Sequence, residues 1–320
     1  MKDKILEIKD LYVDYITDDG IVHAVNGLNL ELMKGQTFGI VGETGAGKTS
    51  TALSVMKLLP EQVGRITQGS IFLDYKNITN MSEIEMRKVR GNIVSMIFQD
   101  PMTSLNPVLT VGEQIEEVLE IHQADLGKQE IYNRVNDILE MVGLEKERKT
   151  EYPHQLSGGM KQRIIIAIAL ACEPKLLIAD EPTTALDVTI QAQILDLMNG
   201  LKSKFNTTMM LITHDLGVVA QICDSVAIMY AGEVIEQGTI ENIFTPGRHH
   251  PYTIGLFSSV PDLTKETKRL NPIKGLMPDP MNLPSGCAFH PRCSRCMEIC
   301  KHEVPRNGCV GTHIVKCHLY

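Results

Sequence analysis

The sequence predicts an α/β protein with a parallel sheet at its centre. Short apolar runs at residues 37–41, 176–179 and 209–213 have the length of buried strands, and segments with helical spacing separate them. This alternation of strand and helix favours parallel strands joined by crossover helices. A glycine-rich loop follows the first run directly, and a long helical stretch interrupts the strand pattern over about residues 101–172.

The first hundred residues predict most of the β structure. Polar and apolar residues alternate over residues 3–15 and 21–32, which is typical of paired strands, so we expect an N-terminal antiparallel β part. Residues 37–41 (TFGIV) predict a fully buried strand, and residues 48–59 have helical character. Two more short strands are expected at residues 70–73 and 93–98.

The middle of the chain changes to helical periodicity. Within residues 111–122 and 129–142, apolar residues recur three and four positions apart, as at Ile131, Val135 and Ile138. After residue 246 the chain is rich in Pro, His and Cys and loses this periodicity. We therefore expect one domain over residues 1–245, with the helical part inserted in it, and a C-terminal extension over residues 246–320.

Composition excludes some classes of function. The chain has 320 residues and a formal net charge of −8, whereas a general nucleic-acid-binding protein usually has a basic excess. A membrane-spanning helix needs about 20 mostly apolar residues, and the longest stretch without a charged residue, 249–261, contains two prolines. The N-terminus has no signal-peptide core. We expect a cytoplasmic protein whose membrane role depends on partners.

The glycine-rich loop has the pattern G-x-x-x-x-G-K-[ST], between a predicted strand and a predicted helix. Glycines let several N–H groups converge on phosphate oxygens, and the helix N-terminus adds partial positive charge. Lysine reaches the β- and γ-phosphates, and the following hydroxyl binds Mg²⁺. The loop consists of Gly42, Glu43, Thr44, Gly45, Ala46, Gly47, Lys48 and Thr49.

A second motif supplies two carboxylates. The apolar run 176–179 ends at Asp180, which we expect beside Mg²⁺, and Glu181 follows it. Glu181 is the candidate for orienting or deprotonating an attacking water. Two acids after a strand are a weak signal alone, but together with the phosphate loop they indicate a nucleoside triphosphatase.

Further motifs resemble those of ABC-type ATPases. Leu156-Ser157-Gly158-Gly159-Met160 is similar to the family signature, although Met160 replaces the usual Gln. Gln99 in IFQDP resembles the Q-loop, Asp187 in TTALD the D-loop, and His214 in LITHD the switch histidine. These motifs follow the family order, and the resemblance covers about residues 3–245. It implies an ABC ATPase cassette with a phosphate-loop core.

The resemblance also implies roles for individual residues. The expected catalytic set is Lys48, Gln99, Glu181 and His214, and the expected Mg²⁺ ligands are Thr49, Gln99 and Asp180. ATP would further contact Ser50 and an aromatic residue, for which Tyr15 is the candidate and Tyr12 the alternative. In this family the signature of one subunit caps the nucleotide of another. Ser157, Gly158 and Gly159 would therefore serve a second cassette.

The C-terminal extension resembles that of one group within the ABC-type ATPases. Residues 246–254 (PGRHHPYTI) and the later LPSGCAFHPRC resemble oligopeptide and dipeptide importer ATPases. The resemblance implies a 4Fe–4S cluster held by Cys287, Cys293, Cys300 and Cys317 in a small lobe over about residues 280–320. Zinc and the absence of metal are the alternatives, and participation of Cys296 or Cys309 stays open.

The expected function is ATP hydrolysis coupled to uptake of dipeptides or oligopeptides. The resemblance implies a second ABC ATPase subunit, two transmembrane permease subunits and an extracytoplasmic solute-binding protein, with this chain at the cytoplasmic face of the membrane. Import of nickel or another small solute is an alternative. A soluble ABC ATPase is a further one, although such proteins commonly carry two cassettes in one chain.

Overall fold

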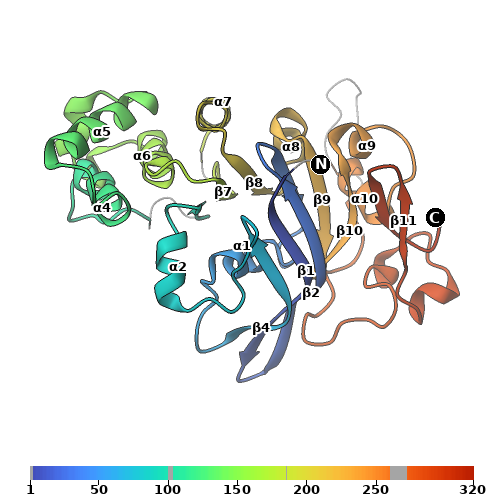
Figure 1. Cartoon of the computed structure of the whole chain (residues 1–320). Coiled ribbons are helices and arrows are strands. Elements are labelled where there is room, and N and C mark those ends of the chain that lie inside the picture. The colour runs from blue at the N-terminus through green and yellow to red at the C-terminus, as the bar shows by residue number, and fades with distance from the viewer. Residues whose placement is uncertain (1–2, 100–103, 185, 260–271) are drawn as a thin grey trace. The chain divides into compact units, whose positions relative to one another are not determined.

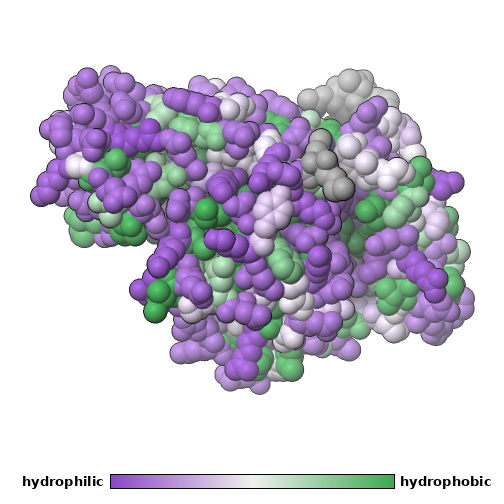
Figure 2. All heavy atoms as spheres, in the orientation of Figure 1, coloured by the Kyte–Doolittle hydropathy of each residue, from purple (hydrophilic) through white to green (hydrophobic). Residues whose placement is uncertain are grey.

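The computed structural model describes residues 3–99, 104–184, 186–259 and 272–320 (Figure 1). The chain forms two compact units, described separately below. Unit 1 comprises Met1–Leu6, Glu31–Thr37 and Phe72–Ile212, and unit 2 comprises Glu7–Leu30, Phe38–Ile71 and Thr213–Tyr320. Among the described residues, no helix has both the length and the apolar character that crossing a membrane requires. Hydrophilic residues cover most of the face in Figure 2.

Unit 1 contains three parallel strands. β6 (Val94–Ile97) pairs with β7 (Leu176–Asp180), and β7 pairs with β8 (Thr208–Thr213). Every residue of these three strands is buried, as expected for a parallel sheet covered on both faces. Helix α7 (Val188–Phe205) forms the crossover between β7 and β8. The predicted strands and crossover helix are confirmed here.

The remaining elements of unit 1 are mainly helical. Helices α4, α5 and α6 lie together in Figure 1 and contact one another. Helices are present where helical spacing was predicted, over residues 111–122 and 129–142, whereas residues 101–103 of the expected helical insertion (about 101–172) lie outside the described residues. These elements are β5 (Lys76–Asn77), α2 (Glu83–Val89), α4 (Val111–His122), α5 (Lys128–Met141), α6 (Gly158–Leu170) and the 3₁₀ turns η1 (Lys146–Thr150) and η2 (Pro153–Gln155).

Unit 2 is built on a mixed sheet. β3 (Thr37–Val41) runs parallel to β9 (Ser225–Tyr230), and β10 (Glu233–Thr239) pairs antiparallel with β9. The long strands β1 (Lys4–Thr17) and β2 (Gly20–Met33) and strand β4 (Gly64–Leu73) have most of their residues in this unit. The predicted N-terminal strands are therefore present: β1 begins one residue later and ends two residues later than the alternation indicated, and β2 extends one residue further at each end.

Short helices complete unit 2. Helix α1 follows the glycine-rich loop, as predicted, but ends at Met56 because Lys57 adopts a left-handed conformation (φ 49°). The helices are α1 (Lys48–Met56), α8 (Leu216–Ile222), α9 (Ile240–Phe244) and α10 (Pro251–Ser258), with the 3₁₀ turns η3 (His290–Arg292) and η4 (Glu298–Lys301).

The C-terminal segment belongs to unit 2, and a separate Cys-rich lobe over residues 280–320 is not confirmed. β12 (His313–Lys316) pairs antiparallel with β10, and β11 (Asn307–Val310) pairs with β12. Phe289 is 3% exposed and stacks edge-on against Tyr230 and Tyr252. Backbone pairing and aromatic packing therefore hold this segment within unit 2.

His250 makes the stability of unit 2 dependent on pH. Its side chain caps α10, where Nδ1 accepts a hydrogen bond from the Tyr252 N–H, and burial lowers its pKa to about 3. The folded state thus binds this proton less readily than the unfolded state. Stability from this residue is present above about pH 6.5 and is lost as the pH falls below it, by about 2 kcal/mol at pH 5.

We predict that His250→Asn, which keeps a capping acceptor, reduces the loss of stability between pH 7.5 and pH 5. Urea unfolding of both proteins at the two pH values measures this difference. An equal loss in wild type and variant would show that His250 does not titrate as described.

Candidate functional site

The phosphate loop begins at the end of β3 and leads into α1. Gly45 and Gly47 have positive φ values of 84° and 94°, conformations that glycine adopts without strain. A Cβ atom on Gly42 would lie 2.4 Å from the carbonyl oxygen of Met229, and one on Gly47 would lie 2.4 Å from that of Ala24. Backbone packing therefore requires glycine at both ends of the loop.

Lys48 lies over the loop. Its Nζ donates hydrogen bonds to the carbonyl oxygens of Gly42 at 2.8 Å and of Glu43 at 3.1 Å, and the residue is only 8% exposed. Ala46 N–H also donates to the Glu43 carbonyl. Hydrogen bonds to carbonyl groups of the loop therefore hold Lys48 in place at the start of α1.

This arrangement fits a nucleotide phosphate. The glycines leave space where side chains would otherwise lie, and no protein atom lies within 4 Å of a Cβ placed on Gly45. A buried ammonium group and a helix N-terminus provide positive charge beside that space. Thr44 and Thr49 are exposed, and Ser50 is half-buried, so these hydroxyl groups are accessible from solvent.

Tyr15 lies beside the loop. Its hydroxyl donates to Ser50 Oγ at 3.1 Å, and the residue is half-buried. Tyr12 is 37% exposed and lies against Gly27. The contact with Ser50 favours Tyr15 over Tyr12 as the residue next to a nucleotide, and its stacking on adenine stays a prediction.

Glu43 has two partners that sequence reasoning missed. Its backbone N–H donates to the Tyr252 hydroxyl at 3.0 Å, and its carboxylate accepts two hydrogen bonds from Arg292, at 2.7 and 3.1 Å. Both partners belong to the C-terminal extension. Only the charge of Arg292 offered a sequence signal, and nothing in the pattern linked it to a position 249 residues away.

Unit 1 brings three of the predicted catalytic and metal-binding residues together. Asp180 ends β7 and is 1% exposed, and Glu181 follows it with φ 48°. Glu181 Oε2 accepts hydrogen bonds from Gln99 Nε2 at 3.3 Å and from the Thr184 hydroxyl at 3.0 Å. Gln99 and the two acids therefore lie at one end of the parallel strands, as the motif order predicts.

The signature residues begin helix α6. Ser157 is its N-cap, and its hydroxyl accepts a hydrogen bond from the Met160 N–H at 3.4 Å. Ser157 and Gly158 are exposed, and a Cβ on Gly159 would lie 2.9 Å from Ile190 Cγ2. The start of this helix is open to contact with another molecule.

His214 lies in unit 2 and is exposed, directly after Thr213, the last residue of β8. The next residue, Asp215, caps α8 through hydrogen bonds from the Gly217 and Val218 N–H groups. The role of His214 toward a γ-phosphate stays a prediction.

Comparison with known families identifies this set of motifs. The family described as "ABC transporter" matches residues 25–184, which include the phosphate loop, Gln99, the signature and both acids. The chain belongs to the ABC transporter family. It is an ABC-type ATPase, as predicted from the sequence. The family described as "Oligopeptide/dipeptide transporter, C-terminal region" matches residues 235–300.

Individual relatives match nearly the full chain. The oligopeptide transport ATP-binding protein AppD of Bacillus subtilis is 50% identical over 99% of this chain and 97% of its own length. The Escherichia coli oligopeptide transport ATP-binding protein OppD is 51% identical over 95% and 89%. A dimeric cassette, MJ0796 bound to ADP and Pi, superposes with a TM-score of 0.66 at 28% identity, covering 73% of this chain and 98% of that chain. The predicted cassette fold is confirmed.

The iron–sulfur prediction is wrong. The relatives that share about half of their residues with this chain are described as transport ATP-binding proteins, and their descriptions name no iron–sulfur group. The prediction overlooked the packing of two of these cysteines. Cys287 and Cys293 pack against the core cluster of unit 2, and burial raises the pKa of Cys287 to about 11 and also raises those of Cys293 and Cys317. Burial thus favours the neutral form of these thiols.

Zinc, the alternative metal for the cysteines, stays a prediction. Thiolates around tetrahedral zinc lie about 4 Å from one another, given Zn–S bonds of about 2.3 Å. Among the described residues, which include all eight cysteines, no three cysteine sulfurs lie within 4.8 Å of one another.

The ligand-type atoms that do converge are those of Glu236, His249 and His313. The buried Glu236 carboxylate accepts hydrogen bonds from both imidazoles, at 2.7 and 2.8 Å, from the His250 N–H and from the Thr253 hydroxyl. His249 Nε2 also faces the Thr245 carbonyl oxygen at 2.8 Å. Each ligand-type atom is engaged in hydrogen bonding, so we interpret this cluster as a structural network that joins β10, α10 and β12.

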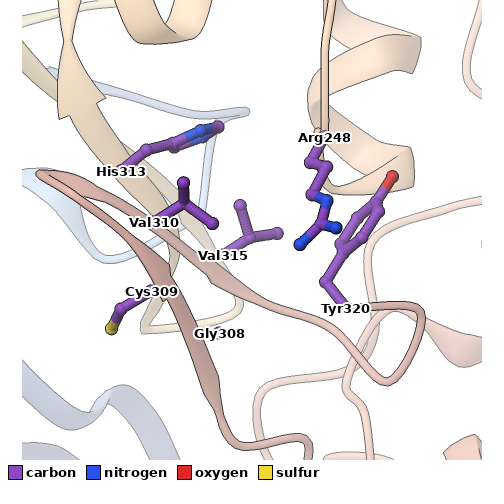
Figure 3. Close-up of a pocket in the computed structure, with 7 residues that line it drawn as sticks. All are labelled: Arg248, Gly308, Cys309, Val310, His313, Val315 and Tyr320. Carbon is purple, nitrogen blue, oxygen red and sulfur yellow. The ribbon is translucent and has the colours of Figure 1, made fainter.

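A surface pocket of about 530 Å³ lies in unit 2 beside the C-terminal hairpin (Figure 3). Arg248 and Tyr320 lie side by side at one side of it, with the guanidinium 5.8 Å from the ring centre. Its other lining residues are Gly308, Cys309, Val310, His313 and Val315. It contains none of the predicted nucleotide-binding residues.

Proposed function

We propose that this chain is the ATP-hydrolysing subunit of a membrane ABC importer and that it couples hydrolysis to uptake of dipeptides or oligopeptides. The observation that carries the proposal is the near-full-length likeness, at about 50% identity, to transport ATP-binding proteins named for oligopeptides and dipeptides. The match of residues 235–300 to the oligopeptide and dipeptide transporter family supports it independently of the cassette motifs.

The chain's own residues have distinct roles in this proposal. The N–H groups of residues 42–49 bind the phosphates, and Lys48 exchanges its loop carbonyl partners for phosphate oxygens. Thr49, Gln99 and Asp180 would hold Mg²⁺, which would offset charge on the phosphates. Ser50 and Tyr15 contact the rest of the nucleotide. His214 donates a hydrogen bond to the terminal phosphate and responds to its loss.

Glu181 is the proposed general base. Its carboxylate is held by hydrogen bonds from Gln99 and Thr184, which fix one oxygen and limit rotation of the side chain. A carboxylate in this state can accept a proton from a water directed at the γ-phosphate. Because Gln99 touches Glu181, a change at the Q-loop alters the position of the base.

A second ABC ATPase subunit is the proposed partner of the signature. The chain has one copy of each motif, and Ser157 and Gly158 at the start of α6 are exposed. Their hydroxyl and N–H groups can bind the γ-phosphate held by another cassette. In the assembled importer we expect a similar but distinct partner, and therefore a heterodimer.

The other proposed partners are two transmembrane permease subunits and, through them, an extracytoplasmic solute-binding protein. The helical segment over about residues 101–172 is the proposed coupling surface, and exposed Val108 and Ile121 support a protein contact there. The chain then lies at the cytoplasmic face of the membrane, and no nucleic acid takes part. In this proposal residues 1–245 form the catalytic cassette and residues 246–320 form its extension.

Uptake of labelled peptides by cells that carry or lack the chain tests the proposal, together with co-purification of permease subunits. We expect loss of peptide uptake and recovery of two permeases. Loss of nickel uptake alone would favour a metal importer. Recovery of the chain without any membrane protein would favour a soluble ABC ATPase.

We predict that Glu181→Gln retains ATP binding and lowers turnover about 100- to 10,000-fold, the usual cost of losing a general base. The amide keeps the shape of the side chain but removes the basic oxygen, whereas Lys48 and the loop amides still hold the nucleotide. Phosphate release by the assembled transporter measures turnover. A rate within about threefold of wild type would exclude Glu181 as the base.

We also predict that the isolated chain is a poor ATPase whose specific activity rises with protein concentration. The signature must complete a site on another cassette, so activity requires association. ATPase rates over a dilution series, with and without the partner ATPase, measure this dependence. Full activity from a monomer, independent of concentration, would refute the shared site.

A further inference from the structure

Three polar side chains of unit 2 bind Glu43. Its carbonyl oxygen accepts from Lys48 Nζ, its N–H donates to the Tyr252 hydroxyl, and its carboxylate binds Arg292. The first contact lies inside the phosphate loop, whereas the other two come from the C-terminal extension. Glu43 therefore connects the extension to the residues that bind phosphate.

Arg292 has the environment of a fixed positioning group. Its side chain is 5% exposed, and its two terminal nitrogens bind the two carboxylate oxygens of Glu43. Its Nε donates to the Lys274 carbonyl oxygen at 3.1 Å, and the guanidinium lies 5.8 Å from the centre of the Tyr230 ring. A planar guanidinium held at both ends fixes a carboxylate in one orientation.

The Tyr252 hydroxyl fixes the backbone at the same position. Tyr252 is fully buried and stacks edge-on against Tyr230, with ring centres 4.7 Å apart. Its hydroxyl accepts a hydrogen bond from the Glu43 N–H, which is one of the first N–H groups of the loop. The conformation of residue 43 is therefore determined from the extension as well as from the loop sequence.

We infer that Arg292 is a positioning residue for ATP binding, because it orients Glu43 and through it the phosphate loop and Lys48. The inference rests on the proposed nucleotide-binding role of the loop. It assigns to the extension a direct effect on nucleotide affinity, in addition to its part in the unit 2 core. Because Arg292 acts before chemistry, it affects binding of substrate and transition state equally, so it changes KM and leaves kcat nearly unchanged.

The test compares MgATP binding by the full chain in wild type, Arg292→Ala, Glu43→Ala and the double variant. A displacement of about 1 Å in a positioned group can cost about 100-fold, so we expect Arg292→Ala to weaken MgATP binding about tenfold or more. In the assembled transporter KM for ATP should rise by a similar factor, while kcat changes less than about twofold. If the two residues act only as a pair, the loss of affinity in the double variant does not exceed the larger of the two single-variant losses.

Two controls separate this effect from loss of folding and from failure of the proposed site. Arg295→Ala removes an exposed guanidinium three positions away and should bind MgATP as wild type does. Lys48→Ala should abolish binding. If Arg292→Ala does not fold, Glu43→Ala breaks the same ion pair from its more exposed partner, whose side chain is 31% exposed.

The inference would be overturned if the folded Arg292 and Glu43 variants bound MgATP within about twofold of wild type while Lys48→Ala did not bind it. The loop would still be the nucleotide site in that case. Losses that add in the double variant would also overturn it, because each residue would then act separately. Wild-type binding by Lys48→Ala would remove the proposed role of the loop, and the inference would fall with it.

Discussion

Close backbone packing beneath the phosphate loop is the constraint on which unit 2 depends. The loop at Gly42 lies against the Met229 carbonyl near the end of β9, and at Gly47 it lies against the Ala24 carbonyl in β2. Gly232, in the turn from β9 to β10, donates to the Ala46 carbonyl and accepts from the Asn26 N–H. A side chain at either loop glycine would separate three chain segments. The geometry that lets N–H groups converge on phosphate is therefore also the geometry that joins these strands.

Polar contacts attach the C-terminal extension to this framework. Glu236 on β10 is fully buried and receives hydrogen bonds from α10, from its preceding loop and from His313 on β12. A buried carboxylate is costly to desolvate unless such donors surround it, so the network specifies one arrangement of these elements. The aromatic cluster of Tyr230, Tyr252 and Phe289 packs beside it. Arg292 and Tyr252 then extend the same arrangement to the phosphate loop.

The sequence predicted those parts of the fold and of the site whose causes are local. Glycine spacing and flanking apolar runs identified the phosphate loop, β7 and its two acids, because each depends on neighbouring residues. It did not predict the pairing of β12 with β10 or the contact of Arg292 with Glu43, since these join residues far apart in the chain. The cysteine-rich segment was interpreted from a family resemblance and from the spacing of its cysteines. That interpretation left out Phe289 and the apolar side chains around it, against which Cys287 and Cys293 pack.

The extension also marks where this chain departs from a minimal cassette. The solved cassette MJ0796 is covered over 98% of its length but accounts for 73% of this chain. Arg292 lies within residues 235–300, the part that matches the oligopeptide and dipeptide transporter family, and outside residues 25–184, the part that matches the ABC transporter family. Glu43, by contrast, lies inside the cassette match. The ion pair therefore connects a residue inside the ABC transporter match to the segment that matches the oligopeptide and dipeptide transporter family. Such a contact gives the extension a physical means of acting on nucleotide binding without altering any catalytic motif.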